Sequence, residues 1–68
     1  MVKIYEIVQV TNREHRWFPA LVVVTKIYDW GIQGYTHVPL SGDAYIRLKF
    51  EDFESTLGEA IVIPKDEG

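Results

Sequence analysis

Residues 43–64 read DAYIRLKFEDFESTLGEAIVIP, and this stretch decides the fold class of the chain. Its first part alternates strictly between apolar and polar residues, which is the period of a strand with one buried face. The predicted strand has an inward set of Ala44, Ile46, Leu48 and Phe50 and an outward set of Tyr45, Arg47 and Lys49.

The residues that follow predict one short helical turn. Phe53 and Leu57 follow Phe50 at spacings of three and seven residues, as on one face of a helix. Gly58 is suited to close the turn, because glycine adopts left-handed backbone conformations freely. Residues 59–63 then predict a last strand, which Pro64 ends.

Three more strands are predicted upstream, over residues 4–10, 20–28 and 32–38. Glu6 shares a face with Val8, so pairing of the first strand is expected to begin after Glu6. The valine-rich second strand is either covered on both faces or contains a bulge that switches faces midway. Gly34 inside the third strand indicates a bulge or a sharp bend.

The 68 residues predict one domain over residues 1–64 and a charged tail over residues 65–68. Because the chain has no cysteine, disulfides and thiolate metal sites are excluded, and packed apolar side chains must form the core. The predicted core consists of Val8, Val10, Val22, Val24, Ile32, Ile46, Leu48, Phe50, Phe53, Leu57, Ala60 and Val62.

The net charge of −3 is unevenly distributed along the chain. Residues 1–50 carry six basic and four acidic side chains, a sum of +2, and residues 51–68 carry one basic and six acidic side chains, a sum of −5. Nucleic-acid binders usually show a clear basic excess, which this chain lacks. No apolar run is long enough to span a membrane and no signal-peptide pattern is present, so a cytoplasmic location is expected.

Five short strands with one helical turn before the last strand is the order of elements in SH3-like barrels. The segments Val8-Gln9-Val10, GIQGY at residues 31–35 and residues 53–62 resemble the small barrels of phage-encoded and KOW-type modules. The resemblance implies an all-β, five-stranded SH3-like barrel with a short helical turn between the fourth and fifth strands. An Ala-Leu-Tyr-Asp-Tyr-like segment is absent, so conventional recognition of proline-rich peptides is not expected.

Two groups of residues invite a catalytic interpretation, and each has a simpler explanation. His37, Ser41 and Asp43 have the composition of a nucleophilic triad, but Ser-Gly-Asp is an ordinary turn sequence. The acidic residues around Phe53 suit the solvated face of a helical turn, whose dipole favours acids near its start. We therefore expect no enzyme.

A metal site is the third chemical interpretation. His15, His37 and Glu14 would supply the ligands of an open metal site. Surface histidine is the more common role for such residues. No metal and no cofactor are expected.

Aromatic and basic side chains are the strongest functional feature. Aromatic rings beside cations suit peptide docking and also base stacking. Alternatively, the two tryptophans cap the open ends of the barrel, and the two tyrosines are cross-strand partners. The candidate partner-binding set is Arg13, Arg16, Trp17, Trp30, Tyr35, Tyr45, Arg47 and Lys49.

The leading hypothesis is a non-enzymatic binding module of phage type that recruits a protein partner through this aromatic face. A first alternative is a KOW-like nucleic-acid accessory protein that uses the four cations of the set with the same aromatics. A second alternative is a self-associating subunit, either a homodimer or part of a virion assembly, which pairs through the valine-rich second strand at a sheet edge.

Overall fold

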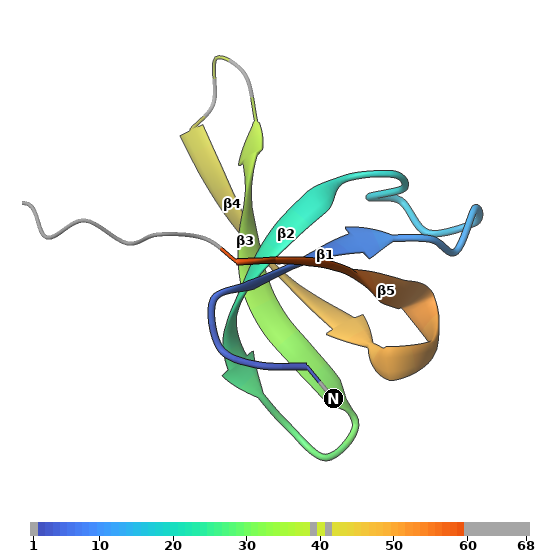
Figure 1. Cartoon of the computed structure of the whole chain (residues 1–68). Helices are drawn as coiled ribbons and strands as arrows, with labels where there is room; N and C mark the ends of the chain where they lie inside the picture. The colour runs from blue at the N-terminus through green and yellow to red at the C-terminus, as the bar shows by residue number, and fades with distance from the viewer. Residues whose placement is uncertain (1, 39, 41, 60–68) are drawn as a thin grey trace, which may run out of the picture.

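The structure is a computed structural model that describes residues 2–38, 40 and 42–59, and it is an all-β fold (Figure 1). Its strands form one antiparallel sheet in the order β4-β3-β2-β1-β5. The elements are β1 (Glu6–Val10), β2 (Leu21–Ile27), β3 (Gly31–Val38), β4 (Gly42–Lys49), the 3-10 turn η1 (Phe50–Asp52) and β5 (Phe53–Glu59).

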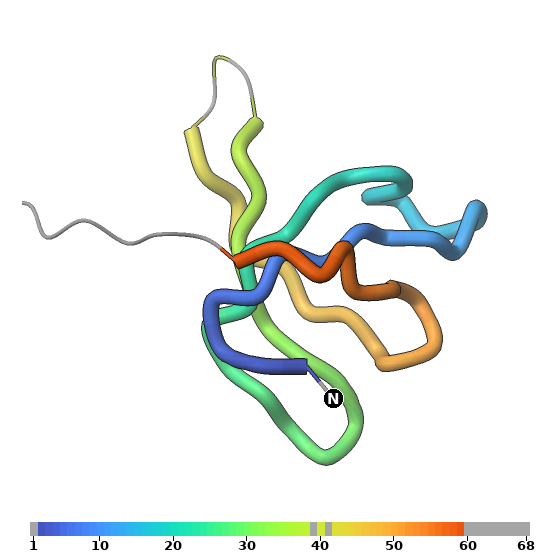
Figure 2. Tube along the Cα trace, viewed as in Figure 1, coloured from blue at the N-terminus to red at the C-terminus, as the bar shows by residue number. Residues whose placement is uncertain are grey.

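Five antiparallel strands with a 3-10 turn between the fourth and fifth confirm the predicted all-β class and the order of its elements. Among the described residues no pairing joins β4 to β5, so the sheet is open. Figure 2 shows how strongly the sheet twists, so that its strands cross one another at large angles in this view.

The first strand begins its pairing at Glu6, so the expectation that pairing begins after this residue is wrong. Glu6 pairs with Glu59 of β5 and is only 7% exposed. A carboxylate is tolerated there because the Lys3 amide (2.8 Å) and the Ser55 hydroxyl both donate hydrogen bonds to it. Buried charge is costly only when it lacks such donors.

The second strand contains the predicted bulge. Val24 pairs with Gly34 and Lys26 pairs with Gln33, which leaves Thr25 as an extra residue. The Thr25 hydroxyl donates to the Gln33 carbonyl at 3.2 Å. The bulge bends β2 across β3, so that Val22 and Val24 are fully buried before it while Ile27 is 42% exposed after it.

Gly34 makes this close crossing of β2 and β3 possible. A Cβ at this position would collide with the Val23 carbonyl oxygen and would lie 2.7 Å from Val22 Cγ1. The predicted bulge in the third strand at Gly34 is wrong, because β3 is continuous there and the bulged residue belongs to the opposite strand, β2.

The turn and the last strand lie several residues earlier than predicted. The turn is Phe50–Asp52, and β5 begins at Phe53. Phe53 and Leu57 therefore do not share a helical face, because both belong to an extended strand. Of the predicted last strand over residues 59–63, only Glu59 lies within the described residues, and it is the final residue of β5.

An irregularity in β5 explains the exposure of Leu57. Val8 pairs with Ser55 and Ile7 pairs with Gly58, so Thr56 and Leu57 loop out between them. Leu57 has a φ of 66°, and its amide is hydrogen-bonded to the Ser55 hydroxyl at 2.9 Å. Hydroxyl side chains thus satisfy the backbone that leaves the ladder.

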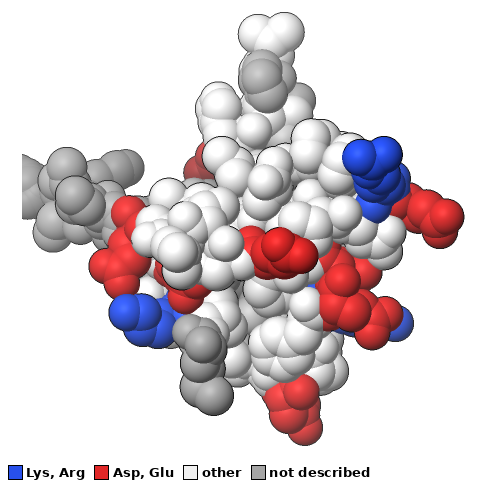
Figure 3. Space-filling view, turned by 45° about the vertical axis from the view of Figure 1, so that its right-hand side comes forward, with Lys and Arg blue, Asp and Glu red and all other residues white. Residues whose placement is uncertain are grey.

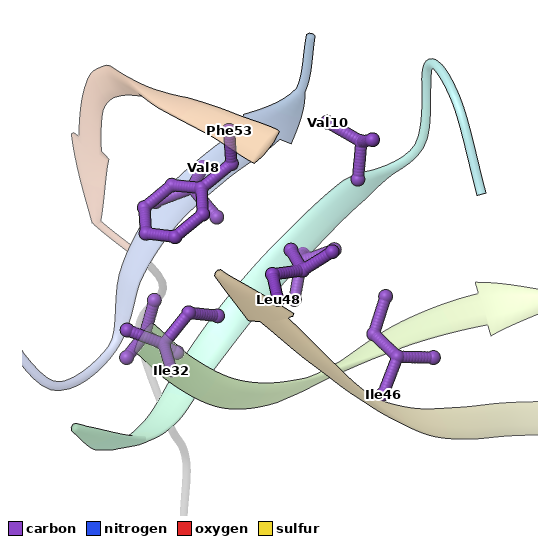
Figure 4. Packing of buried hydrophobic residues seen from close by; sticks show 8 residues of the cluster. Val8, Val10, Ile32, Ile46, Leu48 and Phe53 are labelled. Carbon is purple, nitrogen blue, oxygen red and sulfur yellow. The ribbon is translucent and has the colours of Figure 1, made fainter. Parts of the chain in front are cut away.

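Eight apolar side chains converge between the strands to form the core (Figure 4). They confirm most of the predicted core. Phe50 is 45% exposed and Leu57 is 93% exposed, so both were wrongly assigned to it. Ala60 and Val62 lie outside the described residues. The core consists of Val8, Val10, Val22, Val24, Ile32, Ile46, Leu48 and Phe53.

The edges of the sheet are β4 and β5, and β2 lies at its centre between β3 and β1. The expectation that the valine-rich strand forms an edge is therefore wrong. Its valines alternate between the core and the outer face of the sheet, where Val23 is half-buried. Any strand addition must use β4 or β5.

Candidate functional site

An apolar groove of about 600 Å³ is the main concave feature among the described residues. It lies where the β2–β3 turn, η1 and β5 meet. Its apolar lining is supplied by Val2, Ile27, Tyr28, Phe50, Phe53 and Leu57. A volume of this size falls in the range of binding pockets for small molecules or for a few side chains of a partner.

Three features of the fold place these side chains around one hollow. The β2 bulge turns Ile27 away from the core, the early turn at η1 leaves Phe50 outside it, and the loop in β5 projects Leu57 outward. Phe53 forms the floor, since it is 8% exposed and its ring lies 6.0 Å from that of Phe50. The exposed apolar lining therefore follows from specific departures from regular strand geometry.

The charged side chains that line the groove are all acidic: Glu6, Asp29 and Glu54. The hydrogen bond from the Ser55 hydroxyl has the largest effect on Glu6 and lowers its pKa below the ordinary value of 4.5. Burial raises this pKa, and the hydrogen bond from the Lys3 amide lowers it further. Glu6 is therefore ionised at neutral pH. Acidic side chains are prominent on the face shown in Figure 3, which turns the side of the molecule with β5 and η1 toward the viewer.

Trp30 extends the aromatic surface from the groove onto the β2–β3 turn. Its ring stacks on that of Tyr28, with centroids 5.0 Å apart and planes 4° from parallel. Tyr28 lines the groove, and Trp30 remains 45% exposed. The sequence-predicted site residue Trp30 thus contacts a lining residue of the groove.

Trp17 has a different environment. It is partly buried and packs against the core cluster, as expected for a cap over one end of a small core. The Arg16 guanidinium lies 5.8 Å from the centre of its ring, in cation–π range. Arg13 and Arg16 are exposed in the β1–β2 connection.

The remaining four predicted site residues lie together on the outer face of the β3–β4 hairpin. Tyr35 pairs with Tyr45, and their rings meet edge to face at 6.0 Å. Arg47 lies two pairs further along, opposite Gln33, and its Nε donates a hydrogen bond to Gln33 Oε1 at 3.1 Å. Lys49 is exposed at the end of the strand. The predicted set is thus divided among three locations.

Of the three residues considered for a nucleophilic triad, the structure describes two, and these two lie close together. His37 Nδ1 lies 3.4 Å from Asp43 Oδ1 on the exposed hairpin, and Ser41 lies outside the described residues. His15 Nδ1 accepts a hydrogen bond from the Trp17 amide at 3.1 Å. Within residues 2–38, 40 and 42–59, no three acidic or histidine side chains are grouped to hold a metal ion.

Sequence reasoning missed the groove because it assigned its lining residues elsewhere. Phe50 and Leu57 were placed in the core, and Ile27 and Tyr28 were treated as ordinary strand residues. The available signal was the adjacent apolar pair Ile27-Tyr28 immediately before the Asp29-Trp30-Gly31 turn, because successive side chains of a strand point to opposite faces and cannot both enter one core.

None of the helical segments in the described part of the chain is long and apolar enough to cross a membrane. No protein-family model, curated protein or solved structure matches the chain.

Proposed function

We propose that this chain is a small, non-enzymatic protein-binding module of the SH3-like class. Its groove would bind an extended segment of a partner that carries apolar side chains next to Lys or Arg. The observation that carries the proposal is an apolar, aromatic groove whose charged lining residues, among those that the structure describes, are all acidic: Glu6, Asp29 and Glu54.

The assignment to the SH3-like class is supported by the strand order and by the 3-10 turn immediately before the last strand. The phage-type origin is supported by the resemblance of Val8-Gln9-Val10 and of residues 31–35 to phage-encoded barrels. A cytoplasmic location remains part of the same proposal.

The chemistry of the groove favours a protein partner over a nucleic acid. Aromatic side chains such as Trp30 and Phe50 supply large contact areas at low cost in side-chain entropy, which is why they are enriched at protein interfaces. Acidic groups at the rim attract basic segments and repel phosphates. The partner should therefore bind more weakly as salt rises, although its apolar contacts persist.

The test is an NMR titration of labelled protein with two short synthetic peptides. One contains two leucines flanked by arginines, and the other has the same leucines flanked by glutamates. Shifts confined to Tyr28, Trp30, Phe50 and Leu57 with the arginine peptide, and weaker shifts with the glutamate peptide, are expected. Phe50→Ala should weaken binding about tenfold, as expected for loss of an aromatic anchor.

Matched controls separate local from general effects. Phe18→Ala removes an equally exposed phenylalanine (40%, against 45% for Phe50) from the β1–β2 connection and should leave binding unchanged. Asp29→Lys should weaken binding of the arginine peptide, whereas Glu14→Lys, which is outside the groove, should not. Absence of peptide shifts at the groove would contradict the proposal.

A mixed single-stranded oligonucleotide, titrated at low and then physiological salt, tests the alternative class of partner. Shifts at Tyr45 and Arg47 that fade steeply with salt would favour the nucleic-acid hypothesis, because phosphate contacts depend strongly on salt.

A further inference from the structure

The strand β4 is an edge of the sheet formed by the described residues, and its register is regular. Among the described residues it pairs with β3 alone, over eight consecutive positions without a bulge. The outer part of the β3–β4 hairpin extends beyond the other strands (Figure 1). Such an edge presents unpaired backbone groups to another chain.

The two edges of the sheet differ in their suitability for pairing. β5 is interrupted where Thr56 and Leu57 leave the ladder, and its only charged residues, Glu54 and Glu59, have the same sign. A second copy aligned with β5 would meet both an irregular backbone and like charges. β4 carries both signs on its outer face, with Asp43 near its start and Arg47 and Lys49 near its end.

We propose that two copies of this chain associate through antiparallel pairing of their β4 strands, centred on Tyr45. In this register Asp43 of each copy faces Arg47 of the other, so the two-fold axis generates the ion pair twice. On the inner face, Ala44 faces Ile46. The two sheets become one continuous sheet.

The charged side chains on the outer face of β4 keep atoms available for hydrogen bonds to a second copy. Oδ1 of Asp43 contacts His37, and Nε of Arg47 donates a hydrogen bond to Gln33. Oδ2 of Asp43 and the terminal guanidinium nitrogens of Arg47 can therefore bind the second copy. Arginine forms bidentate pairs with carboxylates, a geometry that favours Arg47 as the partner of Asp43.

Tyr45 supplies the apolar contact at the centre of this interface. Its side chain is 71% exposed and its ring already lies against Tyr35 on the same face. Directly opposite residues in antiparallel strands have Cβ atoms about 4.5–5.5 Å apart. The dimer would therefore extend one pair of tyrosines into a row of four across the combined sheet.

The strand alone contributes a small area, so the dimer should be weak and should form over concentrations from about 10 µM to about 1 mM. Analytical ultracentrifugation over this range is the primary measurement. Arg47→Asp places two acids opposite each other at both ends of the interface and should weaken association about tenfold or more. Asp43→Arg should do the same with two cations.

The double variant Asp43→Arg/Arg47→Asp restores opposite charges in the same register and should recover association. Lys26→Asp makes the same type of charge change on the central strand β2 and should leave association unchanged. A pairing shifted by two residues would instead place Asp43 opposite Lys49, so Lys49→Glu is included and should have little effect.

Oxidation of the Tyr45→Cys variant gives an independent measure of the register. The chain has no native cysteine, so a disulfide-linked dimer can form only through this position. It should form faster than in Lys26→Cys. A strict monomer at the highest concentration, a dimer insensitive to both charge reversals, or a loss of association in Lys49→Glu alone would overturn the proposal.

Discussion

The substitution Leu48→Ala tests which leucines hold the fold together. Leu48 is 1% exposed and lies among the eight core side chains. The change removes three carbon atoms, and at about 0.8 kcal/mol for each buried CH₂ group the lost transfer free energy is about 2.4 kcal/mol. The cavity left behind adds to this, so a total loss of about 2–5 kcal/mol is expected.

That loss is large for so small a domain. At about 0.05–0.15 kcal/mol per residue, a 68-residue chain has a free energy of unfolding of about 3–10 kcal/mol. Leu48→Ala should therefore lower the midpoint of urea unfolding strongly, or leave much of the protein unfolded at 25 °C. Circular dichroism during urea and thermal unfolding measures the effect.

Leu57→Ala is the matched control, because the sequence assigned both leucines to the core and the structure separates them. Leu57 is 93% exposed, and both leucine and alanine carry the same strain at its φ of 66°. Its replacement should change the free energy of unfolding by less than about 0.5 kcal/mol. Equal losses in the two variants, or a larger loss in Leu57→Ala, would refute the assignment of β5 and its outward loop.

Three further outcomes are expected. Gly34→Ala should destabilise the protein by more than about 1 kcal/mol, because its Cβ would collide with the backbone of β2. Gly58→Ala should cost less, because its closest contact, at 3.3 Å, is the side-chain atom Thr56 Oγ1, which must shift by only a few tenths of an ångström; thermal unfolding compares the two. Glu6→Gln should destabilise the protein at pH 7, and the difference from wild type should shrink as the pH falls below about 4.5. The sign follows because the pKa of Glu6 is lower in the folded state than in the unfolded state. The ionised Glu6 therefore stabilises the fold above the unfolded-state pKa, and this stabilisation is lost when the carboxylate is protonated. Urea unfolding at several pH values measures the difference in free energy of unfolding, and a difference that does not change with pH would contradict the prediction. Asn12→Ala removes the amide that donates to η1 at 2.8 Å and should cost about 1 kcal/mol, with faster amide exchange in the β1–β2 connection as the local readout.

Strand content was predictable where one face of the sheet is buried and the other is not. In β4 the alternation of Ile46 and Leu48 with Tyr45 and Arg47 identifies both the strand and its faces, because side chains alternate along an extended backbone. The same reasoning left two interpretations open for β2, coverage of both faces or a bulge, and the structure has a bulge at Thr25, after the valines. It failed after Lys49, where three apolar residues matched a helical spacing by coincidence.

The candidate groove could not be predicted because it depends on residues that leave the regular pattern. Phe50 ends up outside the core because η1 takes the first residues after β4, which lets Phe53 occupy the position beside Val8 and Val10. Competition between two neighbouring phenylalanines for one core position is decided by packing across the sheet. Nothing local to the sequence distinguishes them.

The sequence by itself determined the class of fold, the absence of disulfides, most of the core and the opposite charges on β4, since these depend on composition and on the two-residue period of a strand. Only the tertiary structure decided which strands form the edges, where β5 begins, and that Ile27, Phe50 and Leu57 meet around one apolar groove. The physical reason is that strand order, bulges and competition for core positions arise from contacts between residues far apart in the chain, whose energies exceed local preferences.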